Sequence, residues 1–112
     1  MSVDYTWPFA TGGGLAVAEI DSIIHQPVRL QLMALLTALD PGEVFDFTGL
    51  RDLLNVTDGN LGAHLLKLEH AGYILQEKVF EARKPKTLIS ATPRGKQAYE
   101  KHVAALQSII AG

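Results

Sequence analysis

Apolar residues recur at helical spacing in several segments of this chain. Between Pro27 and about Leu39, leucines and Met33 fall three and four residues apart, which predicts a central core helix. Pro27 suits the first turn of that helix, where its missing N–H costs nothing, and residues 40–42 (Asp-Pro-Gly) end it. A shorter apolar pattern predicts another helix over residues 15–24.

Residues 48–72 carry the pattern of two helices joined by a tight turn. Thr48 is expected to cap a short helix that runs to about residue 54. After a turn at residues 55–56, Thr57 is expected to cap a longer helix, 58–71, which Gly72 ends in the left-handed conformation. The leucines expected to face the core are Leu50, Leu53 and Leu54 on the short helix, and Leu61, Leu65 and Leu68 on the longer one.

The pattern changes to strands after Gly72. Residues 73–81 and 87–91 are rich in β-branched and aromatic side chains, and the basic stretch 82–86 lies between them. These residues predict an antiparallel ribbon with a basic tip. Thr92 and Pro93 then predict the cap and first turn of a final helix that runs to about residue 110.

The first 14 residues predict a flexible leader, because they end in Thr-Gly-Gly-Gly. Trp7, Pro8 and Phe9 leave two alternatives open, a disordered end or an arm that packs on the body or a partner subunit. Residues 15–112 are expected to form one domain, since 112 residues suffice for one modest core.

Composition excludes several classes of function. The chain has no cysteine, so disulfides and thiolate metal sites are excluded, and its four histidines form no paired metal-ligand motif. Neither a catalytic carboxylate pair nor a phosphate-binding loop is recognisable, so we expect no enzyme, no metal and no cofactor. No signal-peptide pattern or bilayer-length apolar run is present, which predicts a cytoplasmic protein without a membrane partner.

The charge is distributed unevenly around a net value of −2. Residues 1–47 hold one cation, Arg29, against six carboxylates, whereas residues 48–96 hold eight cations against five. Local charge decides which surface meets phosphate, so this asymmetry favours nucleic-acid binding by the second half. Arg29 itself lies on an apolar helix and is expected to be structural, in an ion pair or a carbonyl contact.

The order of these elements, and three stretches of residues, resemble small winged helix-turn-helix transcriptional regulators related to the MarR and ArsR groups. The stretches are IHQPVRLQLMALL, DFTGLRDLLNVTDGNLGAHLLKLEHAGYI and KPKTLISATPRGKQAYEKH. The resemblance covers residues 24–110 and implies an α+β, mainly α-helical fold. It further implies a homodimer that binds double-stranded DNA, with helix 58–71 in the major groove. Gly62 and Ala63 stand where such helices often carry Ser or Arg, which suggests sparse base contacts.

Candidate DNA contacts follow from this arrangement. On the longer helix, Asn60 suits adenine, Lys67 suits guanine or phosphate, and His64 can donate or accept one hydrogen bond. The alternative for these three residues is an ordinary solvated helix face. The other candidates are Thr48, Arg51, Thr57, Asp58 and Ala63 in the helix-turn-helix, and Arg83, Lys84 and Lys86 at the ribbon tip. For the tip the alternative is a charged hairpin end that blocks edge aggregation.

The final helix carries an apolar stripe that continues to its end, namely Tyr99, Val103, Leu106 and Ile110. Such a stripe packs either on its own core or on a second subunit. We expect a homodimer in which Leu15 and Ile20 of the first segment also take part. The alternative function is a winged helix that binds an acidic protein partner instead of DNA. The sequence identifies no small-molecule effector, although a ligand pocket between subunits is a third hypothesis.

Overall fold

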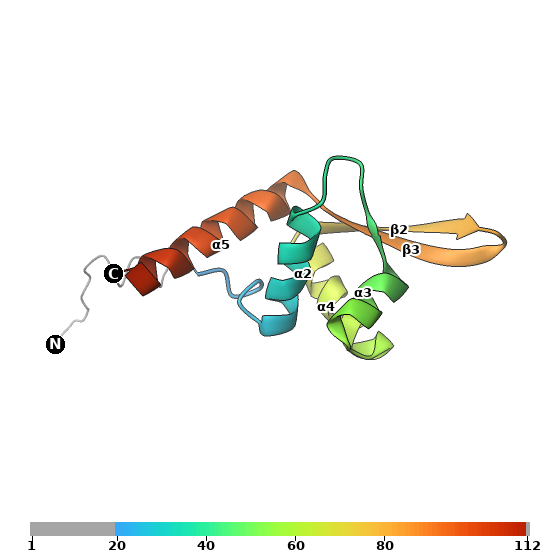
Figure 1. Ribbon diagram of the computed structural model, residues 1–112, viewed down its shortest axis with the longest axis horizontal. Coiled ribbons are helices and arrows are strands. Elements are labelled where there is room, and N and C mark those ends of the chain that lie inside the picture. The colour runs from blue at the N-terminus through green and yellow to red at the C-terminus, as the bar shows by residue number, and fades with distance from the viewer. Residues whose placement is uncertain (1–19, 112) are drawn as a thin grey trace.

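The computed structural model describes residues 20–111, which form four helices and one three-stranded antiparallel sheet (Figure 1). In chain order the elements are α2 (Pro27–Thr37), β1 (Phe45–Asp46), α3 (Phe47–Leu54), α4 (Asp58–His70), β2 (Ile74–Glu81), β3 (Lys84–Ala91) and α5 (Pro93–Ala111). The ribbon β2–β3, called the wing below, extends beyond the helices on the side opposite α5. The predicted α+β architecture is therefore confirmed, with the predicted order of elements from α2 to α5 apart from the added strand β1.

The core lies where α2, α3 and α4 meet the base of the sheet. Its fully buried apolar residues are Ile24, Leu32, Met33, Leu36, Leu50, Leu61, Leu65, Leu68, Ile74 and Ile89. The predicted leucine stripe of α4 is thus confirmed at all three positions. The inward orientation predicted for Leu53 is wrong, because 59% of that residue is exposed.

The helix caps explain where α3 and α4 begin. Thr57 caps α4 as predicted, its Oγ1 accepting the N–H of Asn60 at 3.1 Å. The cap predicted at Thr48 is wrong, because α3 begins at Phe47 and the Asp46 carboxylate accepts the N–H of Gly49 at 3.1 Å. Asp46 ends β1 and already has the extended backbone that a cap requires. Thr48 consequently lies inside the first turn of α3.

The wing is longer and its turn tighter than the sequence predicted. Ala82 and Arg83 alone form the turn, with φ angles of 52° and 66°, and Glu81 pairs with Lys84. Left-handed backbone at both turn residues matches the twist of a two-residue hairpin. Lys84 and Lys86 therefore lie in β3 and not in a loop. The short strand β1, which was not predicted, pairs with residues 88 and 89 of β3.

The helix predicted over residues 15–24 is not found where the structure describes it. Residues 1–19, including the leader and Leu15, lie outside the described residues, and residues 20–24 form a bend and a turn. The Asp21 carboxylate holds this turn by accepting the N–H groups of Ile23 at 2.8 Å and Ile24 at 3.2 Å. It also accepts a hydrogen bond from the hydroxyl of Tyr73.

Helix α5 packs on the body through a face one position away from the predicted stripe. Gly95, His102 and Ala105 are buried, and Tyr99 packs beside the core. Val103 and Leu106 lie half-buried on the flank of the helix, and Ile110 is 84% exposed. Tyr99 of the predicted stripe thus packs on the protein's own core, whereas no other described residue covers Ile110.

His102 makes the stability of this packing dependent on pH. It is fully buried, its Nδ1 accepts the N–H of Asp21 at 3.1 Å, and its ring meets that of His25 edge-on. Burial, followed by the charge of His25, lowers the pKa of His102, while the opposing influence of the Asp21 carboxylate is smaller. An accepting Nδ1 requires the neutral ring, with its proton on the buried Nε2.

We therefore expect the free energy of unfolding to fall as the pH drops below about 6.5, the ordinary pKa of histidine. In that range His102 is protonated in the unfolded chain but stays neutral in the folded chain, so protonation favours unfolding. Chemical denaturation between pH 7.5 and 5 measures this slope, to which His64 contributes in the same direction because its pKa is also lowered. His102→Gln should flatten the slope, and His70→Gln, at an exposed position, should leave it unchanged.

Candidate nucleic-acid interface

The outward face of α4 differs from the one that the sequence predicted. Directly opposite the buried leucines lie Gly59, Ala63, Leu66 and His70, at positions i, i+4, i+7 and i+11. Asn60 and Lys67 are exposed on one flank of that face. The centre of the face is therefore small and apolar, and its hydrogen-bonding groups stand at the edge.

His64 is turned toward the body of the protein. It is half-buried, and its Nδ1 lies 3.1 Å from Nη1 of Arg29. Burial, followed by the positive charges of Arg29 and Lys67, lowers the pKa of His64, which favours the neutral ring as acceptor. Arg29 also donates from Nε to the carbonyl of Ile23, so its predicted structural role is confirmed. His64 thus orients α4 against α2.

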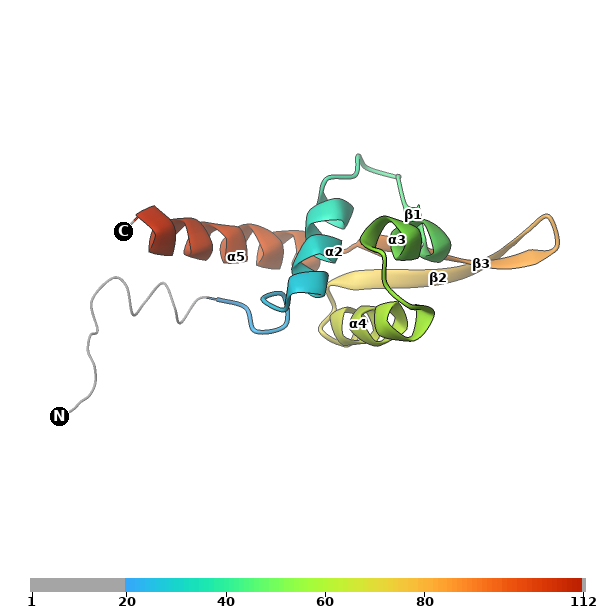
Figure 2. The same cartoon turned by 60° about the horizontal axis from the view of Figure 1, so that its bottom comes forward.

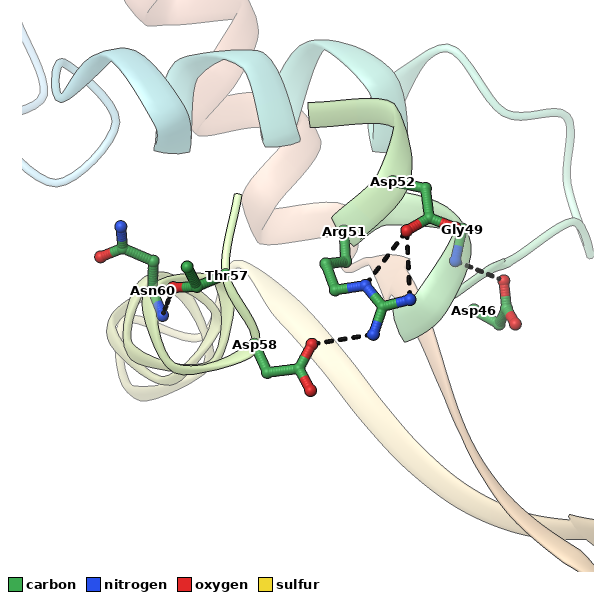
Figure 3. A network of polar contacts seen from close by, with 7 residues as sticks. All are labelled: Asp46, Gly49, Arg51, Asp52, Thr57, Asp58 and Asn60. Carbon is green, nitrogen blue, oxygen red and sulfur yellow. Dashed lines mark hydrogen bonds and ion pairs between the residues drawn. The ribbon is translucent and has the colours of Figure 1, made fainter. Parts of the chain in front are cut away.

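Arg51 and Asp58 join α3 to the start of α4 (Figure 3). Nη1 of Arg51 lies 3.0 Å from the Asp58 carboxylate, and Nη2 lies 3.1 Å from that of Asp52. Both carboxylates raise the pKa of Arg51, the contact with Asp58 most. Arg51 thus forms an ion pair within the motif.

The tip of the wing carries three of the predicted cations. Lys86 lies 2.7 Å from the carboxylate of Glu81 on the facing strand, which raises the pKa of the lysine. Arg83 and Lys84 are exposed and make no ion pair with any carboxylate in the part of the chain that the structure describes. Of the three predicted tip cations, Lys86 is therefore in an ion pair, whereas Arg83 and Lys84 are not in one with any described residue.

Three exposed apolar residues on α3, α4 and the wing were not predicted. Leu66 lies on the outward face of α4, Leu53 lies on α3, and Phe80 lies in β2 with 80% of its surface exposed. The exposure of Leu66 could have been predicted from the helical period of α4, since that residue lies opposite the buried stripe. Phe80 was read only as a strand former, because the register of the hairpin was unknown.

Within residues 20–111, no group of three or more His, Asp or Glu side chains is arranged to hold a metal ion. None of the helices in this range has the length and hydropathy needed to cross a bilayer.

Comparison with known proteins identifies the family. Residues 28–110 match the family of winged helix DNA-binding domains, which spans α2 to α5. The chain belongs to that family. This winged helix domain is also 37% identical, over 81 residues, to an uncharacterized protein of Methanocaldococcus jannaschii, covering 72% of this chain and 85% of the relative.

Two solved structures resemble the winged helix domain. A transcriptional regulator homologue from Pyrococcus horikoshii OT3 superposes with a TM-score of 0.77 at 30% identity, over 88% of this chain and 96% of that one. A transcriptional regulator of the MarR family from Rhodococcus sp. RHA1 gives a TM-score of 0.56 at 17% identity, over 88% of this chain and 70% of that one. The second likeness concerns the fold alone, and the first agrees with the resemblance to transcriptional regulators seen in the sequence.

Proposed function

We propose that the protein is a sequence-specific DNA-binding transcriptional regulator that acts as a homodimer. The observation that carries the proposal is that a chain of the winged helix DNA-binding family has both an exposed face on α4 and two cations, Arg83 and Lys84, that form no ion pair within residues 20–111. In this proposal α4 enters the major groove, and the wing contacts phosphates or the adjacent minor groove.

The exposed residues of α4 suit base and backbone contacts of different kinds. Asn60 has the two groups that pair with adenine, Lys67 suits guanine or phosphate, and the methyl of Ala63 suits a thymine methyl. The hydroxyl groups of Thr48 and Thr57 are exposed for phosphate contacts. Arg51, Asp58 and Lys86 would first have to leave their ion pairs, so we assign them positioning roles.

The homodimer is proposed from the flank and end of α5. Val103 and Leu106 are half-buried, while Ile109 and Ile110 are exposed, and Ile20 lies half-buried in the segment whose next residue, Asp21, contacts His102. A second α5 packed along this flank would cover these residues. Two-fold symmetry would then set two α4 helices about 34 Å apart, one turn of DNA.

We expect Leu106→Asp together with Ile110→Asp to yield a monomer in sedimentation-velocity measurements, whereas the parent chain sediments as a dimer. An unpaired carboxylate in an apolar interface is strongly disfavoured, which supplies the physical reason. Leu75→Asp is the matched control, since Leu75 is 61% exposed at the base of β2, which lies beside the first turn of α5 and not beside its C-terminal end. A parent chain that sediments as a monomer at all concentrations contradicts the dimer.

DNA binding is tested by fluorescence anisotropy with the duplex just upstream of the protein's own gene, over a salt series and against a scrambled duplex. Tight binding that prefers the upstream duplex and weakens steeply with salt supports a specific regulator. If the upstream duplex is not preferred, selection of bound duplexes from a random-sequence pool in the same buffer finds the preferred site, wherever the operator lies. Failure to bind any duplex at low salt contradicts the proposal and favours a protein-binding winged helix.

A further inference from the structure

The tip of the wing exposes an apolar pair among positive charges. Phe80 lies opposite Pro85 in the antiparallel register, and both residues are exposed. Residues 78–86 hold four cations, Lys78, Arg83, Lys84 and Lys86, against a single carboxylate, Glu81. A phenylalanine left in water forgoes the stabilisation that burial of its ring would bring. The pair is therefore suited to a partner that is anionic outside and apolar within.

The alternation of the strands separates this pair from the ion pair of the wing. Phe80 lies on the same side of β2 as Ile74 and Gln76. Ile74 is buried in the core, and the amide of Gln76 approaches the Glu69 carboxylate of α4 at 3.4 Å. Glu81 and Lys86 lie on the other side of the ribbon, where they pair. The apolar pair thus shares the side of the sheet on which α4 packs.

The geometry of the tip is narrow and well defined. The turn has only two residues, both left-handed, and Pro85 has a ring-locked backbone directly opposite Phe80. Figures 1 and 2 show the ribbon reaching past α3 and α4 with nothing beside its end. A narrow ribbon end with an apolar side chain on one face and cations at its turn and on its other face fits the minor groove of DNA, whose walls are phosphates and whose floor is stacked bases.

We infer that Phe80 enters the minor groove as a wedge that partly unstacks one base step, while Arg83 and Lys84 hold the flanking phosphates. This inference rests on the proposed DNA binding and adds a source of specificity to it. Pyrimidine–purine steps such as TA and CA unstack most readily, so the wing selects them by deformability and not by hydrogen bonds. The bound duplex is bent at each wing contact.

The experiment uses the tightest duplex obtained by random-sequence selection, with 2-aminopurine placed singly at each adenine around the half-sites. The fluorescence of this base rises when it unstacks. We expect the full chain to raise it severalfold at one step per half-site. Phe80→Ala should abolish that rise, and Phe80→Leu should keep part of it. Changing the step from TA to AA should weaken the parent chain about tenfold, the size of an ordinary site mismatch, and Phe80→Ala hardly at all.

Leu75→Ala is the matched control, because Leu75 is exposed on the same strand but at its other end. It should behave as the parent chain. Phe80→Ala should keep the parent melting temperature, since the ring makes little contact within the chain. An unchanged melting curve excludes misfolding as the cause of a lost signal.

The outcomes separate this inference from the proposed function. Specific DNA binding with no fluorescence change at any step, and no bend by energy transfer between labelled ends, overturns the wedge and leaves the regulator intact. A signal that survives Phe80→Ala overturns the assignment to Phe80. Absence of binding to every duplex removes the proposed function and the wedge together.

Discussion

Replacing Gly95 with alanine is expected to destabilise the protein by about 3 kcal/mol, the upper end of the usual cost of overpacking. Gly95 lies in the first turn of α5, where it rests on the backbone of Tyr73 just before β2. A Cβ at residue 95 would stand 2.0 Å from the Tyr73 carbonyl oxygen. Because that oxygen belongs to the backbone, the clash can be relieved only if the backbone itself shifts. Helix α5 would have to lift from the sheet, and Thr92 would lose its contacts there.

Gly62→Ala is the control that separates packing from helix propensity. A Cβ at residue 62 meets nothing within 4 Å, so the same substitution should stabilise α4 by about 1 kcal/mol. Urea denaturation of both variants and the parent chain measures the difference. Equal effects in the two variants would mean that α5 does not approach the sheet this closely.

Joint replacement of Arg83 and Lys84 by alanine is expected to weaken DNA binding about 50-fold for each subunit of the dimer at 0.1 M salt, equally for all sequences. Each phosphate contact contributes about 0.9 to the slope of log affinity against log salt. Losing two contacts therefore lowers that slope by about two per subunit. Arg83 and Lys84 form no ion pair with a carboxylate within residues 20–111, so both are available to phosphate.

Two controls bracket this result. Lys101→Ala removes an exposed cation from α5, far from the wing, and should leave the slope unchanged. Glu81→Gln frees Lys86 from its ion pair and should strengthen binding slightly. An unchanged slope in the Arg83 and Lys84 variant would remove the wing from the proposed interface.

The sequence predicted best those features that depend on neighbouring residues. The stripe on α4 repeats over two turns, and Thr57 and Gly72 mark the limits of that helix with local chemistry. Helix α3 has only eight residues, too few to tell an inward Leu53 from an outward one. Strand β1 has two residues, so it shows no periodicity at all.

The features of the site that the sequence did not predict depend on contacts between distant parts of the chain. The contact of His64 with Arg29 joins residues 35 positions apart, so no local pattern indicates it. Residues 84–86 were predicted to lie between the strands, yet they belong to β3; Pro85 is accommodated there because β1 pairs only with residues 88 and 89, which leaves β3 an open edge at residue 85. The register that follows from this arrangement is what brings Phe80 and Pro85 together.

The junction around Thr92 has a consequence for control of the protein. Its hydroxyl donates to the carbonyl of Gly72 at 2.6 Å, and its N–H donates to that of Tyr73 at 3.0 Å. Its hydroxyl also accepts the N–H of Gly95, so the residue that caps α5 is hydrogen-bonded to the two residues that follow the C-cap of α4. The start of α5 is therefore fixed to the chain directly after α4. In the proposed dimer, a change in how α5 packs on its partner would reach that junction without any change in a side chain that contacts bases.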